Sequence, residues 1–139
     1  MQPPAQPPLH LRPELAELDR ITAYIESFAE QHGLNTGDAY ALSLAAEELF
    51  VNTVKHSDPP ATSVEFSLAR GGDDVIASYS DDALPYNPTL QRAPDTTLLV
   101  DERPVGGLGI HFIRKTMQSF HYARLEGRNV ITLSRRLTG

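Results

Sequence analysis

The sequence predicts an α+β fold: a two-layer α/β sandwich in which a mainly antiparallel sheet is covered on one face by three helices. Two pairs of strand-like segments are each joined by a short turn, and strands joined in this way are antiparallel. Three other segments repeat apolar residues at helical spacing. Three helices cover only one face of a sheet economically, so two layers are expected.

The N-terminal part is expected to contain a tail, a strand and a helix. Residues 1–8 hold four prolines and are expected to be disordered, so the single predicted domain spans residues 9–139. Residues 9–12 alternate apolar and polar side chains, which is typical of a short edge strand. Pro13 suits the first position of a helix, and apolar residues at helical spacing continue that helix to about residue 31.

A second helix is predicted after a glycine stop at Gly33. Asn35 or Thr36 can cap this helix, which is expected to end near His56. One stripe of the helix is apolar and should face the core: Leu42, Ala45, Ala46 and Leu49.

Two hairpins are expected in the remaining chain. The first joins residues 62–69 to residues 74–80 through the turn Arg70–Asp73, whose sequence is RGGD. The second joins residues 121–125 to residues 129–137.

An irregular stretch and a third helix lie between the two hairpins. Residues 81–105 contain four prolines and little periodicity, and loops of this length usually act as lids or binding loops. Gly106–Gly109 then lead into a helix with an apolar stripe. The stripe consists of Ile110, Ile113, Met117 and Phe120.

Composition narrows the classes of function. The 139 residues include no cysteine, which excludes a disulfide framework and a thiolate nucleophile. No apolar run is long enough to span a bilayer and no signal-peptide pattern is present, so a cytoplasmic protein without a membrane partner is expected. The formal net charge of −6 argues against direct nucleic-acid binding.

A polar row follows the second helix beside its apolar stripe. Glu48, Asn52 and His56 are spaced by four residues and therefore stack on one helix face. An amide oxygen can ligate Mg²⁺, a carboxylate one turn earlier can deprotonate a hydroxyl, and a histidine can offer positive charge near a phosphate. The alternative is a solvated helix face, which is the commoner meaning of such a row taken alone.

Two further motifs have both a functional and a structural interpretation. Asp81 and Asp82 follow a predicted strand, where a carboxylate can accept a hydrogen bond from an exocyclic amine, although such residues also form simple turns. Gly106, Gly107 and Gly109 precede a helix, where glycines let the backbone approach a phosphate, although glycines also end loops.

In this order, the three stretches resemble the nucleotide-binding boxes of the GHKL (Bergerat-fold) ATPase superfamily. EELFVNTVKH is similar to its E-x-x-x-N box, SDDALPYNP to its D-x-G box, and VGGLGIHFIRK to its G-G-x-G box. The resemblance covers roughly residues 9–137 and is greatest to the anti-sigma-factor serine/threonine protein kinases of the RsbW and SpoIIAB type.

The resemblance implies a role for each matching residue, with ATP and Mg²⁺ as cofactors. Asn52 would ligate the Mg²⁺ that bridges the phosphates, and Glu48 would be the catalytic carboxylate. Asp81 would receive the adenine amino group. Residues 88–105 would form the ATP lid, whose closure would depend on three glycines: Gly106, Gly107 and Gly109.

The resemblance also implies partners. The protein would bind a sigma factor and phosphorylate a serine on an anti-anti-sigma antagonist with a STAS domain, and such proteins often form homodimers. One residue departs from the motif, because the glycine of D-x-G is Ala83 here. If that position needs positive φ or close approach to the purine, nucleotide affinity would fall. The alternative function is therefore a switch protein that binds partners without catalysis, with or without nucleotide. The catalytic half of a histidine kinase ranks third.

Overall fold

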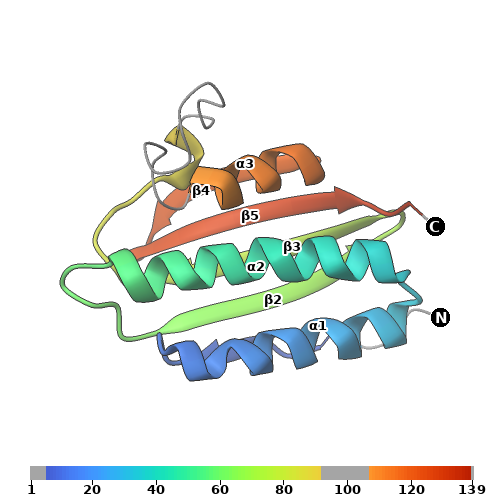
Figure 1. Cartoon of the computed structure of the whole chain (residues 1–139), viewed down its shortest axis with the longest axis horizontal. Helices are drawn as coiled ribbons and strands as arrows, with labels where there is room; N and C mark the ends of the chain where they lie inside the picture. Colours follow the sequence, from blue (N-terminus) through green and yellow to red (C-terminus); the bar gives the residue numbers. More distant parts are fainter. Residues whose placement is uncertain (1–5, 92–106, 139) are drawn as a thin grey trace.

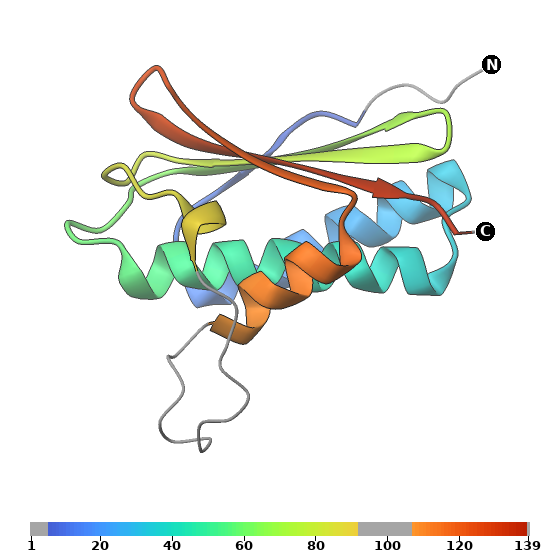
Figure 2. The same cartoon turned by 90° about the horizontal axis from the view of Figure 1, so that it is seen from above.

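The computed structural model describes residues 6–91 and 107–138, and it confirms the α+β architecture. Figure 1 shows the helices lying across one sheet, and Figure 2 shows α1, α2 and α3 on the same face of it. The helices are α1 (Leu18–His32), α2 (Thr36–His56) and α3 (Gly107–Thr116). The strands are β1 (Leu9–Leu11), β2 (Val64–Gly71), β3 (Asp74–Asp81), β4 (Ser119–Leu125) and β5 (Arg128–Arg136).

The described strands form one antiparallel sheet in the order β1-β2-β3-β5-β4. Both predicted hairpins are present, as β2 with β3 and β4 with β5, and β1 is the predicted edge strand. The register pairs Asp81 at the end of β3 with Asn129 at the start of β5. This pairing brings two polar side chains to the helix-covered face of the sheet.

The core lies between the sheet and the helices. Alternate residues of β2 and β3 are buried there, as the period of a strand requires. The predicted apolar stripe of α2 is buried, and so are Ile110 and Ile113 of α3. Burying each leucine or isoleucine side chain of this set stabilises the fold by roughly 1.5–3 kcal/mol, and such burial holds the two layers together. Within the described ranges, the helices lack an apolar run that could cross a lipid bilayer.

The junction between α1 and α2 is built as expected. Gly33 ends α1 in the left-handed conformation with φ +67, and the amide of Leu34 donates to Ala29 O over 2.9 Å. Asn35 is the cap of α2, because its Oδ1 accepts a 2.8 Å hydrogen bond from the amide of Asp38.

Several predicted element bounds are wrong. Helix α3 ends at Thr116, and Phe120, which was expected in its apolar stripe, lies in β4, which begins at Ser119 and not at residue 121. Pro13 does not begin the first helix, because Glu14 is extended and a short 3-10 turn at Leu15–Glu17 precedes α1. The strand expected from residue 62 begins at Val64 instead. The amides of the two preceding residues are taken by the carboxylate of Asp82 rather than by a neighbouring strand.

The C-terminal glycine motif and the long loop also differ from expectation. Gly107 and Gly109 lie inside the first turn of α3 and do not precede it, while Gly106 is outside the described residues. The irregular stretch contains a 3-10 turn, Pro88–Leu90, capped by Asn87. The rest of the predicted lid, residues 92–105, is outside the described residues, as are residues 1–5 of the predicted tail.

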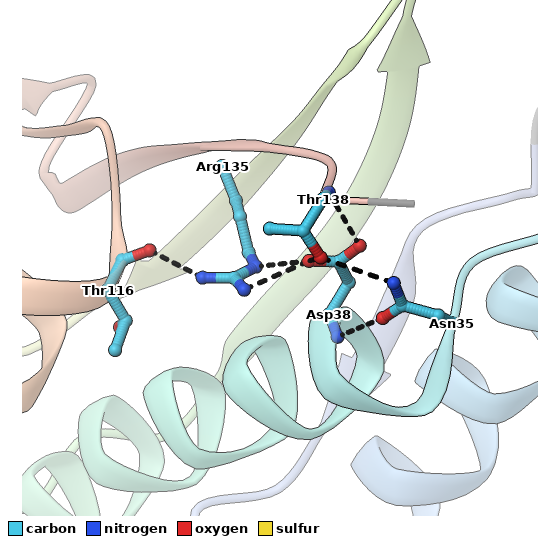
Figure 3. Close-up of polar contacts among 5 residues, drawn as sticks. All are labelled: Asn35, Asp38, Thr116, Arg135 and Thr138. Carbon is cyan, nitrogen blue, oxygen red and sulfur yellow. Dashed lines mark hydrogen bonds and ion pairs between the residues drawn. The ribbon is translucent and has the colours of Figure 1, made fainter.

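A buried ion pair joins the start of α2 to the end of β5 (Figure 3). The side chain of Asp38 is 1% exposed and its Oδ1 lies 2.9 Å from Nη2 of Arg135. Asp38 Oδ2 accepts a 3.0 Å bond from the amide of Thr138. Burial raises the pKa of Asp38, but the hydrogen bonds from Thr138 and Arg135 lower it more, so the pKa lies below its ordinary value.

Two glycines near this junction should respond oppositely to alanine. Gly33→Ala should destabilise the fold by roughly 1–2 kcal/mol, because φ +67 is strained for a residue with a Cβ. Gly37→Ala should be neutral or stabilise by about 0.5–1 kcal/mol, because its new Cβ would make only an ordinary 3.5 Å contact with Asn35 Oδ1. Urea unfolding of both variants measures the change in the free energy of unfolding. Equal changes in the two variants would contradict this expectation.

Asp38 should make stability depend on pH. A carboxyl group whose pKa is lowered by folding stabilises above the ordinary value of 3.8, and this contribution is lost as pH falls through the lower folded-state pKa. Asp38→Asn should therefore cost about 3 kcal/mol or more at pH 7, where it leaves Arg135 buried and unpaired, and progressively less below about pH 4.

Unfolding by urea at several pH values tests this expectation. Glu26→Gln, at an exposed position in the middle of α1, is the control and should change the free energy of unfolding by less than about 0.5 kcal/mol. A difference in stability between Asp38→Asn and the wild-type protein that stays constant from pH 7 to pH 3 would contradict the expectation.

Candidate active site

A pocket of about 450 Å³ lies between the C-terminal half of α2 and the adjoining ends of β3 and β5. Its lining includes three of the predicted site residues, Asn52, His56 and Asp81. Ala83 also lines the pocket. Residues 84–86 and 88 form its outer wall. The first two predicted motifs therefore meet at one cavity.

Asp81 is buried at the pocket wall and accepts hydrogen bonds on both carboxylate oxygens. Oδ2 accepts from the hydroxyl of Thr53 over 2.8 Å, and Oδ1 accepts from Nδ2 of Asn129 over 2.9 Å and from the amide of Ala83 over 3.1 Å. A carboxylate oxygen has room for about two such bonds, so Oδ2 can take one more donor from the pocket. An exocyclic amine is a donor of this kind.

Thr53 and Tyr79 determine the direction of these hydrogen bonds. The Thr53 hydroxyl lies 2.8 Å from Asp81 Oδ2, 2.6 Å from the Tyr79 hydroxyl and 3.2 Å from Leu49 O, and it has one proton to donate. The charged carboxylate is the strongest acceptor, so Thr53 donates to Asp81 and accepts from Tyr79. Burial raises the pKa of Tyr79, which keeps that hydroxyl protonated.

Asn129 fixes both Asp81 and the pocket wall. Its Nδ2 donates to Asp81 and, over 2.9 Å, to Leu84 O, while its Oδ1 accepts from the amide of Tyr86 over 3.1 Å and from the hydroxyl of Tyr122 over 2.7 Å. Sequence reasoning missed this residue and Thr53. The sequence carried little signal for Asn129, because an asparagine directly after a turn is common.

Ala83 does not adopt a conformation that requires glycine. Within residues 6–91 and 107–138, Glu126 is the non-glycine residue with positive φ, so Ala83 lies outside the left-handed region. Its amide donates to Asp81, and its carbonyl accepts a 2.7 Å bond from Nη1 of Arg124. The backbone argument against nucleotide binding therefore does not apply to this chain. The methyl group remains as part of the pocket surface.

Asp82 has a structural role at the start of β2. Its Oδ1 accepts from the amides of Thr62 and Ser63 over 2.7 and 3.1 Å, and its Oδ2 accepts from the Thr62 hydroxyl. Asp82 therefore has a structural role, in which it ties the end of β3 to a distant segment and does not form a simple turn. Asp81, next to it, points into the pocket.

Glu48 lies beside the pocket, where α2 and α3 touch. Nδ2 of Asn52 donates to Glu48 Oε1 over 3.3 Å, which leaves the amide oxygen of Asn52 available to a cation. Burial raises the pKa of Glu48, opposed by the Asn52 hydrogen bond and the nearby His56. A carboxylate with a raised pKa is a better proton acceptor, as a general base requires.

Gly109, from the third motif, lies against the Glu48 side chain beside the pocket. A Cβ built on Gly109 would lie 1.9 Å from Cδ of Glu48, so a side chain there would displace the Glu48 carboxylate from this position. Glycine therefore lets the Glu48 carboxylate lie against the first turn of α3. The sequence had suggested a different reason, close approach to a phosphate. Gly109 thus contacts Glu48, which bonds Asn52 at the pocket lined by His56 and Asp81.

The donor set suits magnesium held by a nucleotide better than a protein-only metal site. The described residues contain no cluster of three or more His, Cys, Asp or Glu side chains placed to bind a metal. Mg²⁺ commonly takes one or two protein oxygens together with phosphate and water oxygens. The amide oxygen of Asn52 fits that pattern.

The chain is similar to known proteins in both sequence and structure. The serine/threonine-protein kinase BtrW of Bordetella bronchiseptica is 28% identical over 97 residues, covering 68% of each chain. The structure of the RsbU and RsbW domains of Rv1364c from Mycobacterium tuberculosis matches 95% of this chain and 33% of its own, with TM-score 0.59 and 20% identity. The blue-light activated histidine kinase of Erythrobacter litoralis EL346 matches 88% of this chain and 41% of its own, with TM-score 0.56 and 14% identity.

The chain spans less than half of either solved structure, and at these identities the two structures show a shared fold. The match to a protein-family model shows more than a shared fold. A model described as a histidine kinase-like ATPase domain matches residues 11–135, a range that contains the whole pocket and all three motifs. The chain therefore belongs to the histidine kinase-like ATPase domain family.

Proposed function

We propose that this chain is a serine/threonine protein kinase of the anti-sigma-factor type, which binds Mg-ATP in the pocket beside α2. The observation that carries the proposal is that Asn52, His56 and Asp81 line one cavity, while Glu48 lies beside it and accepts a hydrogen bond from Asn52. The relative that is named a serine/threonine-protein kinase supports the reaction class. The family supports ATP as the nucleotide.

The two ends of the pocket suit different parts of ATP. At the inner end, Asp81 Oδ2 accepts the adenine amine, while Thr53 and Asn129 hold the carboxylate in place. At the outer end, Asn52 and His56 face the phosphates, and Asn52 holds Mg²⁺ through its amide oxygen. Bound Mg²⁺ would neutralise phosphate charge during transfer.

Glu48 is the proposed general base. The hydroxyl of an acceptor serine gives its proton to the Glu48 carboxylate while its oxygen forms a bond to the γ-phosphorus. The bond from that phosphorus to the β,γ-bridging oxygen breaks, and ADP leaves. Half-burial of Glu48 and its raised pKa favour proton acceptance.

The proposed partners are a sigma factor and an anti-anti-sigma protein with a STAS domain, the latter supplying the acceptor serine. A homodimer and a cytoplasmic location belong to the same proposal, as do a tail at residues 1–8 and the lid role of residues 88–105. The alternative is a binding-only switch with the same fold. The pocket favours nucleotide binding in both cases, and transfer of phosphate separates them.

Asn52→Ala should remove the magnesium-dependent part of ATP binding. Calorimetry with ATP, with and without Mg²⁺, should show that Mg²⁺ strengthens binding to the wild-type protein and has little effect on the variant. Gln31→Ala is a matched control because it removes an amide side chain at an exposed position on α1. It should change stability by less than about 0.5 kcal/mol and leave the Mg²⁺ effect intact. Absence of heat with ATP or ADP in the wild-type protein would rule out the proposal.

Glu48→Gln should keep ATP binding within about two-fold and lower phosphate transfer by about 10²–10⁴-fold, because the amide is nearly isosteric but accepts no proton. The assay follows ³²P transfer from ATP to a recombinant STAS-domain protein. Glu47→Gln is the control, since Glu47 faces α1 through a 3.4 Å bond from Thr22, and its transfer rate should be unchanged. ATP binding without transfer by the wild-type protein would favour the switch.

A further inference from the structure

Helix α3 is attached to the rest of the fold at both ends. Near its N-terminal end, Gly109 packs on the carboxylate of Glu48. At its C-terminal end, the carbonyl of Thr116 accepts a 2.7 Å hydrogen bond from Nη1 of Arg135 (Figure 3). The first contact belongs to the candidate active site, and the second lies at the far end of the helix.

The guanidinium of Arg135 connects α3 to α2. While Nη1 bonds Thr116, Nε and Nη2 each lie 2.9 Å from Oδ1 of Asp38 on the first turn of α2. The hydroxyl of Thr138 also donates to Asp38 Oδ1 over 3.1 Å and accepts from Asn35 over 3.2 Å. The carboxylate of Asp38 is therefore held by the last residues of the described chain.

These contacts set the position of α3 along α2. Glu48 lies ten residues after Asp38 on α2, a distance of about 15 Å, while Gly109 lies seven residues before Thr116 on α3, about 10 Å. The two helices thus run in opposite directions (Figure 2), and α3 contacts two separated points of α2. A shift of α3 at Thr116 moves Gly109 relative to Glu48.

Apolar packing alone does not define this position. Ile110, Ile113 and Met117 are buried and hold α3 against the core, but such contacts are non-directional. The planar guanidinium has fixed donor directions. A buried ion pair usually adds little net stability compared with apolar residues of similar volume, so its main effect here is on geometry.

We propose that Arg135 is a positioning residue for the phosphate end of the nucleotide site: by bonding Thr116 and Asp38, it sets where the first turn of α3 meets Glu48. The inference deepens the proposed function and rests on it. Asp81 and Asn129, which hold the adenine end, make no bond to α3 in the described part of the chain. Loss of Arg135 should therefore affect the two ends of the nucleotide unequally.

The primary test compares adenosine with Mg-ATP by calorimetry. Arg135→Gln should bind adenosine within about two-fold of wild type and Mg-ATP at least tenfold more weakly. The control is Arg136→Gln, the next residue on β5, whose ion pair with Asp74 is at the surface and which should change neither affinity. Equal loss for both ligands in Arg135→Gln, or no loss for either, would overturn the proposal.

A second variant, which leaves no buried unpaired charge, distinguishes loss of positioning from misfolding. Asp38→Leu combined with Arg135→Met replaces the ion pair by apolar side chains and removes the donor to Thr116 O. It should fold, as judged by urea unfolding, and show the same selective loss of Mg-ATP affinity. A well-folded double variant with wild-type affinity for both ligands would overturn the proposal.

Hydrogen exchange tests the inference without nucleotide. In Arg135→Gln and in the double variant, amides of residues 107–116 should exchange at least tenfold faster than in wild type, while those of α1 change little. Uniformly faster exchange, or unchanged exchange in α3, would overturn the positioning role. If the wild-type protein bound neither adenosine nor Mg-ATP, the proposed function would fail, and the exchange result would still decide whether Arg135 positions α3.

Discussion

The burial of the Asp81 carboxylate is the constraint on which the pocket depends. A buried carboxylate must be supplied with hydrogen bonds, and here they come from Thr53 on α2, Asn129 on β5 and the backbone after β3. Three segments that are distant in sequence are thereby brought to one point. The same bonds leave Asp81 Oδ2 able to accept a further hydrogen bond from the cavity, which is the role proposed for it toward the adenine amine.

Helix α2 connects this acceptor to the chemistry proposed at the outer end. Its apolar face packs on the sheet, while Asn52 and His56 line the pocket and Glu48 lies beside it. The helix therefore contributes both to the core and to the wall of the pocket. Close contact with α3 at Gly109 half-buries Glu48 and raises its pKa, so the packing of two helices also tunes the reactivity of the site.

Most of the fold was predictable because its signals are local. Apolar periodicity located the helices and strands, the RGGD turn indicated the first hairpin, and Gly33 and Asn35 marked the ends of neighbouring helices. The errors have non-local causes. Residue 62 does not start β2 because its amide is bound by Asp82, twenty residues later. Asn129 was missed because its importance depends on the register of β3 with β5, which no local pattern specifies.

The sequence by itself determined the α+β class, the polar row on α2 and the three motifs, because spacing along a helix or around a turn depends on neighbouring residues. Only the tertiary structure decided what each motif contacts. It showed that Ala83 needs no left-handed conformation and that Gly109 makes room for Glu48. It also paired Arg135 with Asp38, ninety-seven residues away. Such contacts depend on how the helices pack on the sheet, and that packing is a property of the whole chain.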